Sequence, residues 1–237
     1  MSNVHIIGIS GPSCSGKTTL ARILKKVFSN SVIVHQDDFY KPDTDMPVDP
    51  DTGLENWDCP ESFDPIKMHN SLQYTRAHDG SLPDGHPRGE ENNTHDGSLS
   101  VSQEFLNNLK AMIPKEIDQN TRFVITDGIL LFWDPLIYKE FDSSIFVHAC
   151  KPTLKQRREA RQGYVTQEGY WIDPPGYFDD LVWPQYLKWN AHLFPNGDAK
   201  GIDHEKIKDL LVMESDNSSI EQIATNAVKS IINTVQN

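Results

Sequence analysis

The sequence predicts an α/β fold in which a parallel sheet is flanked by helices. Short apolar runs, which suit strands buried on both faces, alternate with segments that carry apolar residues at helical spacing. A glycine-rich loop joins the first of these runs to the first helical segment. With 237 residues, the chain has the length of one such domain, and we expect a single domain over residues 1–237 with a flexible insertion.

The expected strands are rich in β-branched residues, which favour extended structure. They cover residues 4–9, 32–34, 123–126, 145–147 and 210–213. The expected helices cover residues 20–28, 105–113, 153–161 and 220–235, and an apolar stripe at helical period is clear in 20–28 and 220–235. Before the last of them, Ser218 and Glu221 have the spacing of a capping box. This alternation predicts parallel strands joined by crossover helices.

Charge and composition exclude several classes of protein. The chain carries 22 basic and 34 acidic residues, a net charge of −12, whereas binding to nucleic acid or to an anionic membrane needs a basic surface. We find no apolar run near the roughly 18 residues of a membrane helix and no export signal. Three cysteines make neither a disulfide framework nor a Cys-x-x-Cys site. We expect a cytoplasmic protein, with nuclear access left open, that acts on small molecules.

Three segments stand out by composition. Residues 37–67 contain ten acidic and two basic residues, and we name them the acidic segment. Residues 69–102 contain six apolar residues among 34 and are rich in Gly, Pro, Asn, Asp and His, which predicts a mobile excursion. Residues 151–161 contain five basic residues and one acidic residue, and we expect a lid over residues 153–164. Acidic and basic charge are therefore separated along the chain.

The glycine-rich loop carries the most specific motif. Its residues 11–18 read Gly-Pro-Ser-Cys-Ser-Gly-Lys-Thr and fit G-x-x-x-x-G-K-[ST] at each fixed position. A buried strand before the loop and a helix after it are what the motif requires, because backbone N–H groups and the helix N-terminus bind phosphate oxygens. We expect Lys17 to reach the β- and γ-phosphates and the Thr18 hydroxyl to bind Mg²⁺. The motif predicts a P-loop NTPase.

Carboxylates follow two further expected strands. Asp127 comes directly after residues 123–126 and is a candidate for ordering Mg²⁺. Asp37 and Asp38 follow residues 32–34, at the strand end that opens onto the ligand crevice of such folds. One of this pair can accept a proton from an attacking hydroxyl, while at least one is expected only to stabilise a turn.

Three arginines lie in the expected lid. Arg157 and Arg161 are spaced to share one face of a helix, with Arg158 beside them. Arginines near a phosphate loop can stabilise the negative charge of a transferring phosphoryl group. A solvated charged face is the alternative.

With these motifs, the segments Gln36 to Pro42, Asn56-Trp57-Asp58 and Asp173 to Asp179 closely resemble the nicotinamide riboside kinases. That family is a nucleoside and nucleotide kinase branch of the P-loop proteins, related to uridine kinase. The resemblance spans nearly the whole chain and is weakest in residues 69–102 and 195–209. It implies transfer of phosphate from ATP, with Mg²⁺, to the 5′-hydroxyl of nicotinamide riboside, which gives nicotinamide mononucleotide for NAD biosynthesis.

The resemblance also implies individual roles, with Asp37 as the proton acceptor and Lys17 as the second catalytic residue. The expected ATP contacts are Gly11, Pro12, Ser13, Cys14, Ser15, Gly16, Lys17, Thr18, Thr19, Arg157 and Arg161. The implied riboside contacts are Asp37, Asp38, Phe39, Tyr40, Trp57, Asp58, Arg158 and Tyr164. The expected metal ligands are Thr18, Asp37 and Asp127. Other family members have a different aromatic residue at position 57 and Glu at position 127, so the stacking and the metal geometry stay open.

The acidic segment independently favours a cationic acceptor, because carboxylates and the face of Trp57 attract a pyridinium ring. A solvated acidic loop is the alternative. Nicotinic acid riboside stays open as a second acceptor, and we expect neither nucleic acid nor a membrane as a partner. Two other functions also stay open: a uridine-like or other nucleoside kinase, and a P-loop nucleotide switch without a small-molecule acceptor. The absence of an Asn/Thr-Lys-x-Asp motif for guanine argues against the switch.

Overall fold

Parallel strands form the central sheet of the computed structural model, which describes residues 3–86, 99, 101–161, 163–165, 169–195, 201–203 and 205–236. The strand order is β2–β3–β1–β4–β7. The bounds are β1 (Asn3–Ser10), β2 (Ser31–His35), β3 (Thr121–Gly128), β4 (Ser143–His148) and β7 (Leu211–Glu214). Every pairing in the sheet is parallel, so the predicted fold class and strands are confirmed.

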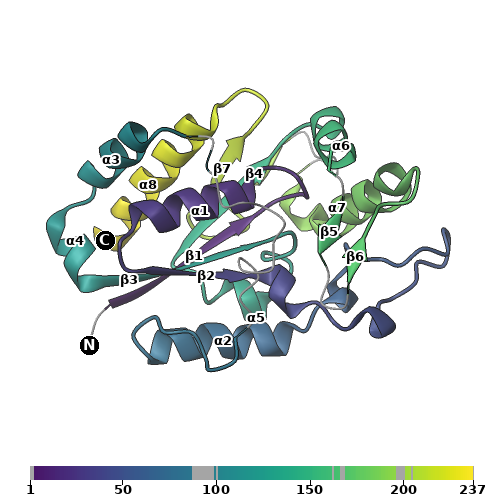
Figure 1. Cartoon of the computed structure of the whole chain (residues 1–237), viewed down its shortest axis with the longest axis horizontal. Helices are drawn as coiled ribbons and strands as arrows, with labels where there is room; N and C mark the ends of the chain where they lie inside the picture. The colour runs from purple at the N-terminus through teal and green to yellow at the C-terminus, as the bar shows by residue number, and fades with distance from the viewer. Residues whose placement is uncertain are drawn as a thin grey trace.

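Helices cover both faces of the sheet (Figure 1). On one face lie α1 (Lys17–Val27), α3 (Gln103–Ala111) and α8 (Ile220–Gln236), and on the other lie α2 (Pro65–Ala77) and α5 (Pro135–Tyr138). The apolar stripe of α1 is fully buried against the strands, as its spacing predicts. Each face has its own apolar core, which explains why β1 is buried along nearly its whole length. Within the described residues, no helix combines the length and the apolar character needed to cross a membrane.

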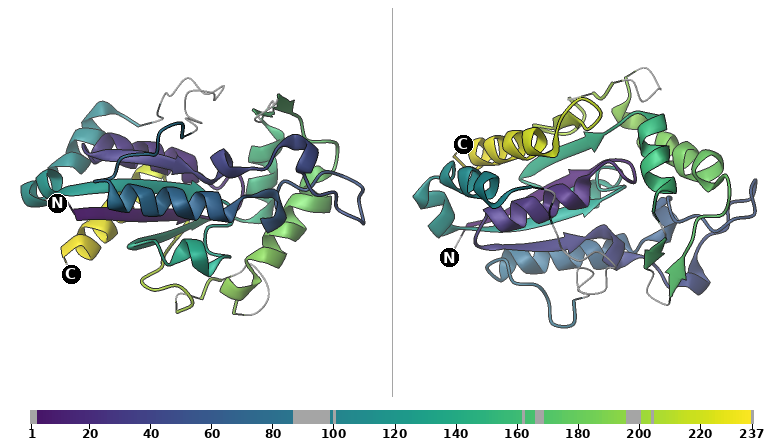
Figure 2. Two further views of the ribbon diagram at one scale, coloured as in Figure 1. Left: turned by 90° about the horizontal axis from the view of Figure 1, so that it is seen from below. Right: turned by 45° about the horizontal axis from the view of Figure 1, so that its top comes forward.

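The carboxyl ends of the strands face the end of the molecule where the lid lies (Figures 1 and 2). The elements there are α6 (Lys151–Glu159), the hairpin of β5 (Tyr164–Val165) and β6 (Tyr170–Trp171), the π-helix η4 (Phe178–Val182) and α7 (Trp183–Trp189). A third apolar cluster joins them to the acidic segment, through Met46, Trp57, Leu154, Tyr177, Phe178, Leu181 and Val182. The acidic segment is therefore packed against the lid.

Shorter elements complete the chain. They are η1 (Gln36–Phe39), η2 (Asp43–Asp45), η3 (Pro60–Ser62), α4 (Lys115–Asn120) and η5 (Ala191–Leu193). Of these, η1 matters for function, because it carries both aspartates that follow β2.

Helix α2 corrects the expected start of the mobile excursion. Residues 69–77 form most of this helix, which begins where the Asp64 carboxylate accepts a hydrogen bond from the Lys67 backbone N–H. Its buried face is narrow and consists of Met68, Ser71, Leu72 and Thr75. Because the helix has so few apolar residues, composition alone does not predict it. Residues 87–98 and 100 of the excursion, and residue 162 of the expected lid, lie outside the described residues.

The predicted end of one helix and the predicted cap of another are also wrong. Helix α6 ends at Glu159, so Arg161 lies beyond the helix and does not continue the face of Arg157. At the start of α8, the Ser219 hydroxyl accepts from the Gln222 backbone at 3.2 Å, and the Gln222 side chain accepts from the Ser219 backbone at 2.8 Å. This capping box lies one residue later than predicted, because two consecutive serines allow two registers.

Gly8 provides a test of the packing in the central strand. A Cβ atom at this position would lie 2.4 Å from the ring of Phe141. We expect Gly8→Ala to lower the free energy of unfolding by about 1–3 kcal/mol, the usual cost of overpacking. Urea unfolding of Gly8→Ala, Phe141→Leu and the double variant measures it. The second change should relieve part of the first, and strictly additive losses would contradict the contact.

Candidate active site

The phosphate loop has the backbone that its motif predicts. Gly11, Cys14 and Gly16 have φ angles of 143°, 64° and 105°, all in or near the left-handed region. A Cβ on Gly11 would lie 2.0 Å from the carbonyl oxygen of Val147 on β4, so this position requires glycine. Helix α1 starts at Lys17 without a side-chain cap, which leaves its first N–H groups available for an anion.

Lys17 lies beneath this loop. Its Nζ donates a hydrogen bond to the carbonyl oxygen of Pro12 at 2.7 Å, and the side chain is buried. Burial lowers the pKa of Lys17 to about 8, against the opposing effects of the Asp127 and Asp37 carboxylates. The cation therefore sits between the phosphate loop and two carboxylates.

A chain of three polar side chains crosses the carboxyl edge of the sheet. The Thr18 hydroxyl donates to Oδ2 of Asp127 at 2.6 Å, and His35 Nδ1 lies 2.5 Å from Oδ1 of the same carboxylate. His35 and Asp127 are register partners at the ends of β2 and β3. Burial alone would raise the pKa of Asp127, but His35 and Thr18 lower it below the ordinary value. Asp127 is thus held ionised where its predicted role requires.

The adjacent aspartates on η1 have different environments. Asp37 is accessible to solvent. Partial desolvation and the nearby Asp127 carboxylate raise the pKa of Asp37, against His35 and Lys17. Asp38 is buried, with its Oδ2 3.8 Å from Nε2 of His86, and burial raises the pKa of Asp38 to about 6. Asp37 is therefore the member of the pair that faces the phosphate loop.

Phe39 also departs from its predicted place. Its ring is 1% exposed, lies in the core on the α2 face of the sheet and contacts the ring of His86. The structure therefore brings neither Asp38 nor Phe39 to the surface of the site. The alternation of side chains around η1 explains this, because successive residues of a helix point in different directions.

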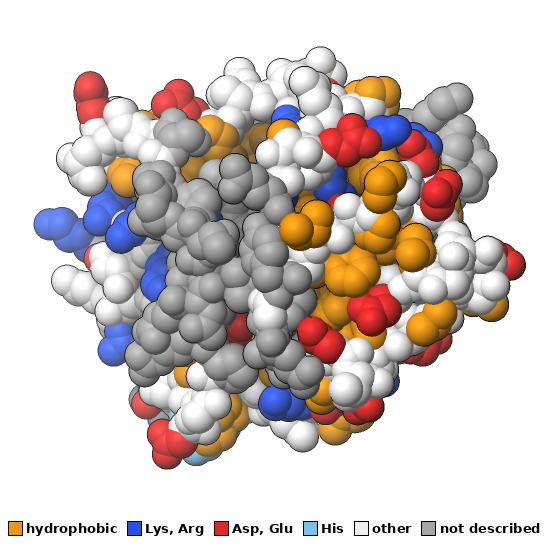
Figure 3. Space-filling model, turned by 45° about the vertical axis from the view of Figure 1, so that its right-hand side comes forward, with side chains coloured by type: hydrophobic (Ala, Val, Ile, Leu, Met, Phe, Trp, Pro, Cys, Tyr) orange, Lys and Arg blue, Asp and Glu red, His pale blue; other side chains and the backbone are white. Residues whose placement is uncertain are grey.

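The remaining predicted acceptor residues form an aromatic cluster with Trp57. The ring centroid of Trp57 lies 5.3 Å from that of Tyr40 and 5.8 Å from that of Trp171. Trp57 is buried, and its indole N–H has no hydrogen-bond partner among the described residues. The Tyr40 hydroxyl donates to the carbonyl oxygen of Trp57 at 3.1 Å. Figure 3 shows hydrophobic side chains gathered beside acidic ones at this end of the molecule.

Arg158 connects the lid to the acidic segment. Its Nε and Nη2 donate to the two carboxylate oxygens of Asp173 at 2.6 and 3.1 Å, and Nη1 lies 3.9 Å from Asp58. Both carboxylates raise the pKa of Arg158, although burial alone would lower it. The guanidinium also lies over the rings of Tyr164 and Tyr177, at 4.9 and 5.6 Å from their centroids. This buried cation is held rigidly from several sides.

The other two arginines differ from each other. Arg157 donates to the Ser215 hydroxyl at 2.9 Å and to the Ser215 carbonyl at 3.1 Å, and approaches the carbonyl of Cys14 at 3.4 Å. Arg161 lies over the ring of Tyr164 at 5.2 Å and acts electrostatically on Lys17. Arg161 is therefore coupled electrostatically to Lys17 of the phosphate loop, whereas Arg157 is bonded to the loop after β7 and to the Cys14 carbonyl of the phosphate loop.

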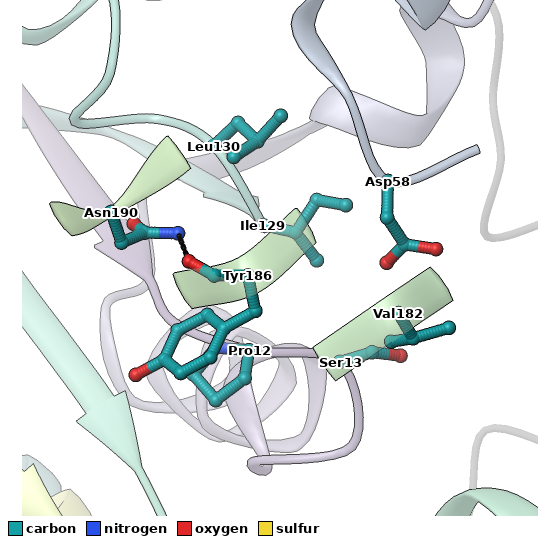
Figure 4. A pocket seen from close by; sticks show the side chains of 8 residues that line it. All are labelled: Pro12, Ser13, Asp58, Ile129, Leu130, Val182, Tyr186 and Asn190. Carbon is teal, nitrogen blue, oxygen red and sulfur yellow. Dashed lines mark hydrogen bonds between the residues drawn. The ribbon is translucent and has the colours of Figure 1, made fainter. Parts of the chain in front are cut away.

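A small pocket lies between the phosphate loop and the segment that ends in α7 (Figure 4). It is lined by Pro12, Ser13, Asp58, Ile129, Leu130, Val182, Tyr186 and Asn190. The Asn190 amide donates to the carbonyl oxygen of Tyr186 at 3.1 Å, and Asp58 enters the pocket from the opposite side. The pocket brings a predicted acceptor contact beside the phosphate loop.

Sequence reasoning gave no role to four residues that the structure brings to the site: His35, Trp171, Asp173 and Tyr177. Asp173 and Tyr177 belong to a segment that carries the family resemblance, and that resemblance is the one feature of the sequence that could have identified them as site residues. His35 can be recognised as a site residue only from the strand register that places it beside Asp127. The site therefore contains a loop that can bind phosphate, the Lys17 cation, the oriented Asp127 carboxylate and the accessible Asp37 carboxylate. Such a set of groups suits phosphoryl transfer to a hydroxyl.

Comparison with known proteins adds independent information. No family model matches the chain. The nicotinamide riboside kinase of Schizosaccharomyces pombe is 39% identical over 98% of this chain and 97% of its own length. That of Saccharomyces cerevisiae is 34% identical over 87% and 86%. Among solved structures, a possible uridine kinase from Bacillus stearothermophilus matches 79% of this chain and 83% of its own, at 18% identity and a TM-score of 0.42.

The buried Asp38 predicts a pH-dependent stability. Because its pKa in the folded chain, about 6, exceeds the ordinary value of 3.8, ionisation destabilises the fold as the pH rises from about 4 to 6. Asp38→Asn removes this cost, so the variant should gain stability relative to the wild type between pH 4.5 and 7.5, by up to about 3 kcal/mol. Urea unfolding at both pH values measures the gain. An equal difference at both values would contradict the shifted carboxyl.

Proposed function

We propose that this chain, which belongs to the nicotinamide riboside kinase family, uses Asp37 and its phosphate loop to phosphorylate the 5′-hydroxyl of nicotinamide riboside. The chain is a kinase that acts in NAD biosynthesis, with ATP as the phosphoryl donor. The observation that carries the proposed mechanism is the position of Asp37. It is an accessible carboxylate with a raised pKa, within electrostatic reach of Lys17 of the phosphate loop.

The donor side follows from the phosphate loop. The uncapped N–H groups of α1 and the loop amides would hold the phosphates of ATP, and Lys17 would exchange the Pro12 carbonyl for phosphate oxygens. Arg161, beside Tyr164 and near Lys17, would add positive charge as the phosphoryl group transfers. Arg157 would first have to release Ser215 to reach a phosphate.

The chain also fits a magnesium ion. Mg²⁺ prefers oxygen ligands and usually keeps waters and substrate phosphates in its shell. Thr18, Asp127 and Asp37 supply such oxygens, and the Thr18 hydroxyl, which donates its hydrogen to Asp127, keeps its lone pairs available. No group of three His, Cys, Asp or Glu side chains suited to a metal occurs in the described part of the chain, so phosphate and water would complete the shell. The ion, when bound, neutralises charge on the phosphates.

On the acceptor side, Asp37 would take the proton of the 5′-hydroxyl. Its raised pKa makes this carboxylate a stronger base than an ordinary aspartate. Asp58 and Arg158 would bind the ribose, because Asp58 lines the pocket beside Pro12 and Ser13 of the phosphate loop, and Arg158 lies 3.9 Å from Asp58 and is held by Asp173. Trp57 and Tyr40 would contact the pyridinium, whose positive charge suits the nearby carboxylates. Nicotinic acid riboside, with the same ribose, is the second acceptor that we propose.

A coupled assay of ADP production with a panel of ribosides tests this function. We expect turnover with nicotinamide riboside and Mg²⁺·ATP, and at most weak turnover with uridine or cytidine. Preference for a pyrimidine nucleoside would favour a uridine-like kinase. ATP hydrolysis that no riboside stimulates would contradict an acceptor function altogether.

Replacement of the proposed base provides a second test. We expect Asp37→Ala to lower kcat by about 10²- to 10⁴-fold, the usual contribution of a general base, while ATP binding is largely retained. Asp38→Ala is the matched control, because the neighbouring carboxylate faces His86 and not the phosphate loop. Steady-state kinetics and ATP titration separate the two effects. A crippled Asp38→Ala beside an active Asp37→Ala would reverse the assignment.

The charge of the acceptor provides a third test. If Trp57 contacts the pyridinium, nicotinamide riboside should bind about 2- to 30-fold better than its neutral reduced form, since a cation–π contact contributes about 0.5–2 kcal/mol. Trp57→Leu should remove much of this preference and raise KM more than it lowers kcat. Calorimetry at low salt measures both ligands. Equal wild-type affinities would show that Trp57 is only an apolar wall.

A further inference from the structure

His35 is a half-buried histidine at the end of β2, and the acceptor and donor roles above do not use it. Its side chain is 12% exposed, and that of Asp127 is 5% exposed. The parallel register of β2 and β3 puts the two residues side by side at the carboxyl edge of the sheet. A one-residue shift in that register would turn one of them to the opposite face. The contact is therefore fixed by the sheet.

The contact constrains the Asp127 carboxylate in a specific way. One oxygen, Oδ1, is engaged by His35 Nδ1 at 2.5 Å, and the other, Oδ2, accepts from Thr18 at 2.6 Å. An ionised carboxylate only accepts hydrogen bonds, so Nδ1 carries the hydrogen. With one partner on each oxygen, the plane of the carboxylate is set, and Oδ2 is directed to the first turn of α1. Without His35, the Thr18 hydroxyl would be the one hydrogen-bond partner left to the Asp127 carboxylate among the contacts that the described residues make.

The charges around Asp127 explain why the orientation of its carboxylate matters for phosphate binding. Lys17 from α1 and Asp37 from η1 both interact electrostatically with Asp127. A carboxylate free to rotate could turn toward Lys17 and pair with it, which would weaken the lysine as a phosphate ligand. Groups that orient a metal-binding side chain commonly matter nearly as much as the ligand itself.

We propose that His35 is a positioning residue, which fixes the Asp127 carboxylate so that Thr18 and Asp127 together present oxygen atoms to the divalent cation of the nucleotide. This inference rests on the proposed function, because it presupposes a cation at Thr18 and Asp127. His35 acts through Asp127 and does not touch substrate.

Substitutions can separate orientation from mere packing. His35→Asn keeps an amide N–H at about the distance of Nδ1 from the backbone, so it can still donate to Oδ1. His35→Leu keeps bulk but removes the donor. His5→Gln is the control for loss of a buried histidine, because His5 lies near the amino end of β1, where it contacts Ser143.

The experiment measures Mn²⁺ binding to the full chain in the presence of ADP, by loss of the free-ion electron paramagnetic resonance signal. We expect His35→Leu to weaken Mn²⁺ binding by about 10- to 100-fold, the usual range for such a supporting group. His35→Asn and His5→Gln should stay near the wild type. In Mg²⁺-dependent kinetics, His35→Leu should raise the Mg²⁺ concentration for half-maximal rate more than it lowers kcat at saturating Mg²⁺.

The outcomes distinguish this inference from the function on which it rests. Wild-type Mn²⁺ binding by His35→Leu, with Asp127→Asn defective, would overturn the role of His35 and leave the cation site intact. Equal loss in His35→Asn and His35→Leu would likewise overturn it, because the histidine would then matter for shape alone. Normal binding by Asp127→Asn would contradict the cation site itself, and with it the metal part of the proposed function.

Discussion

The parallel register of β1, β3 and β2 is the constraint on which the site depends. It brings the phosphate loop after β1, Asp127 at the end of β3 and His35 at the end of β2 to one edge of the sheet. Because β1 is central and buried, the loop starts from a fixed point, and close packing of Gly11 against β4 holds it there. Strand pairing therefore determines where the functional groups of the site lie relative to one another.

Burial of charge is the second organising feature. Lys17, Asp127, Asp58 and Arg158 are all buried, and an isolated buried charge is costly unless it is paired. Each has a partner: Lys17 rests on a carbonyl between two carboxylates, Asp127 lies between Thr18 and His35, and Arg158 lies between Asp58 and Asp173. The partners keep the side chains in place without substrate, so little reorganisation is needed when charge develops during transfer.

The sequence is sufficient to predict those features of the fold and the site that depend on residues close together in the chain. Strands and helices with a strong period were predictable, and so was the phosphate loop, because its motif depends on backbone geometry over eight residues. Features that arise from tertiary packing were not predictable. Nothing in residues 37 to 40 distinguishes the accessible Asp37 from the buried Asp38 and Phe39, since His86 and the α2 face of the sheet decide this difference. The role of Asp173 depends on Arg158, 15 residues earlier, through a hairpin whose strands are too short to predict.

One short helix, α6, carries two arginines that contact different parts of the site. Arg157 and Arg158 are consecutive residues of α6, and consecutive side chains on a helix point about 100° apart. Arg157 accordingly reaches the loop after β7 and the carbonyl of Cys14, while Arg158 reaches Asp58 of the acidic segment and Asp173. Any movement of α6 must shift both sets of contacts together. The loop after β7, the phosphate loop and the acidic segment are therefore linked through one turn of α6, so that the side we propose for ATP and the side we propose for the riboside cannot move independently of this helix.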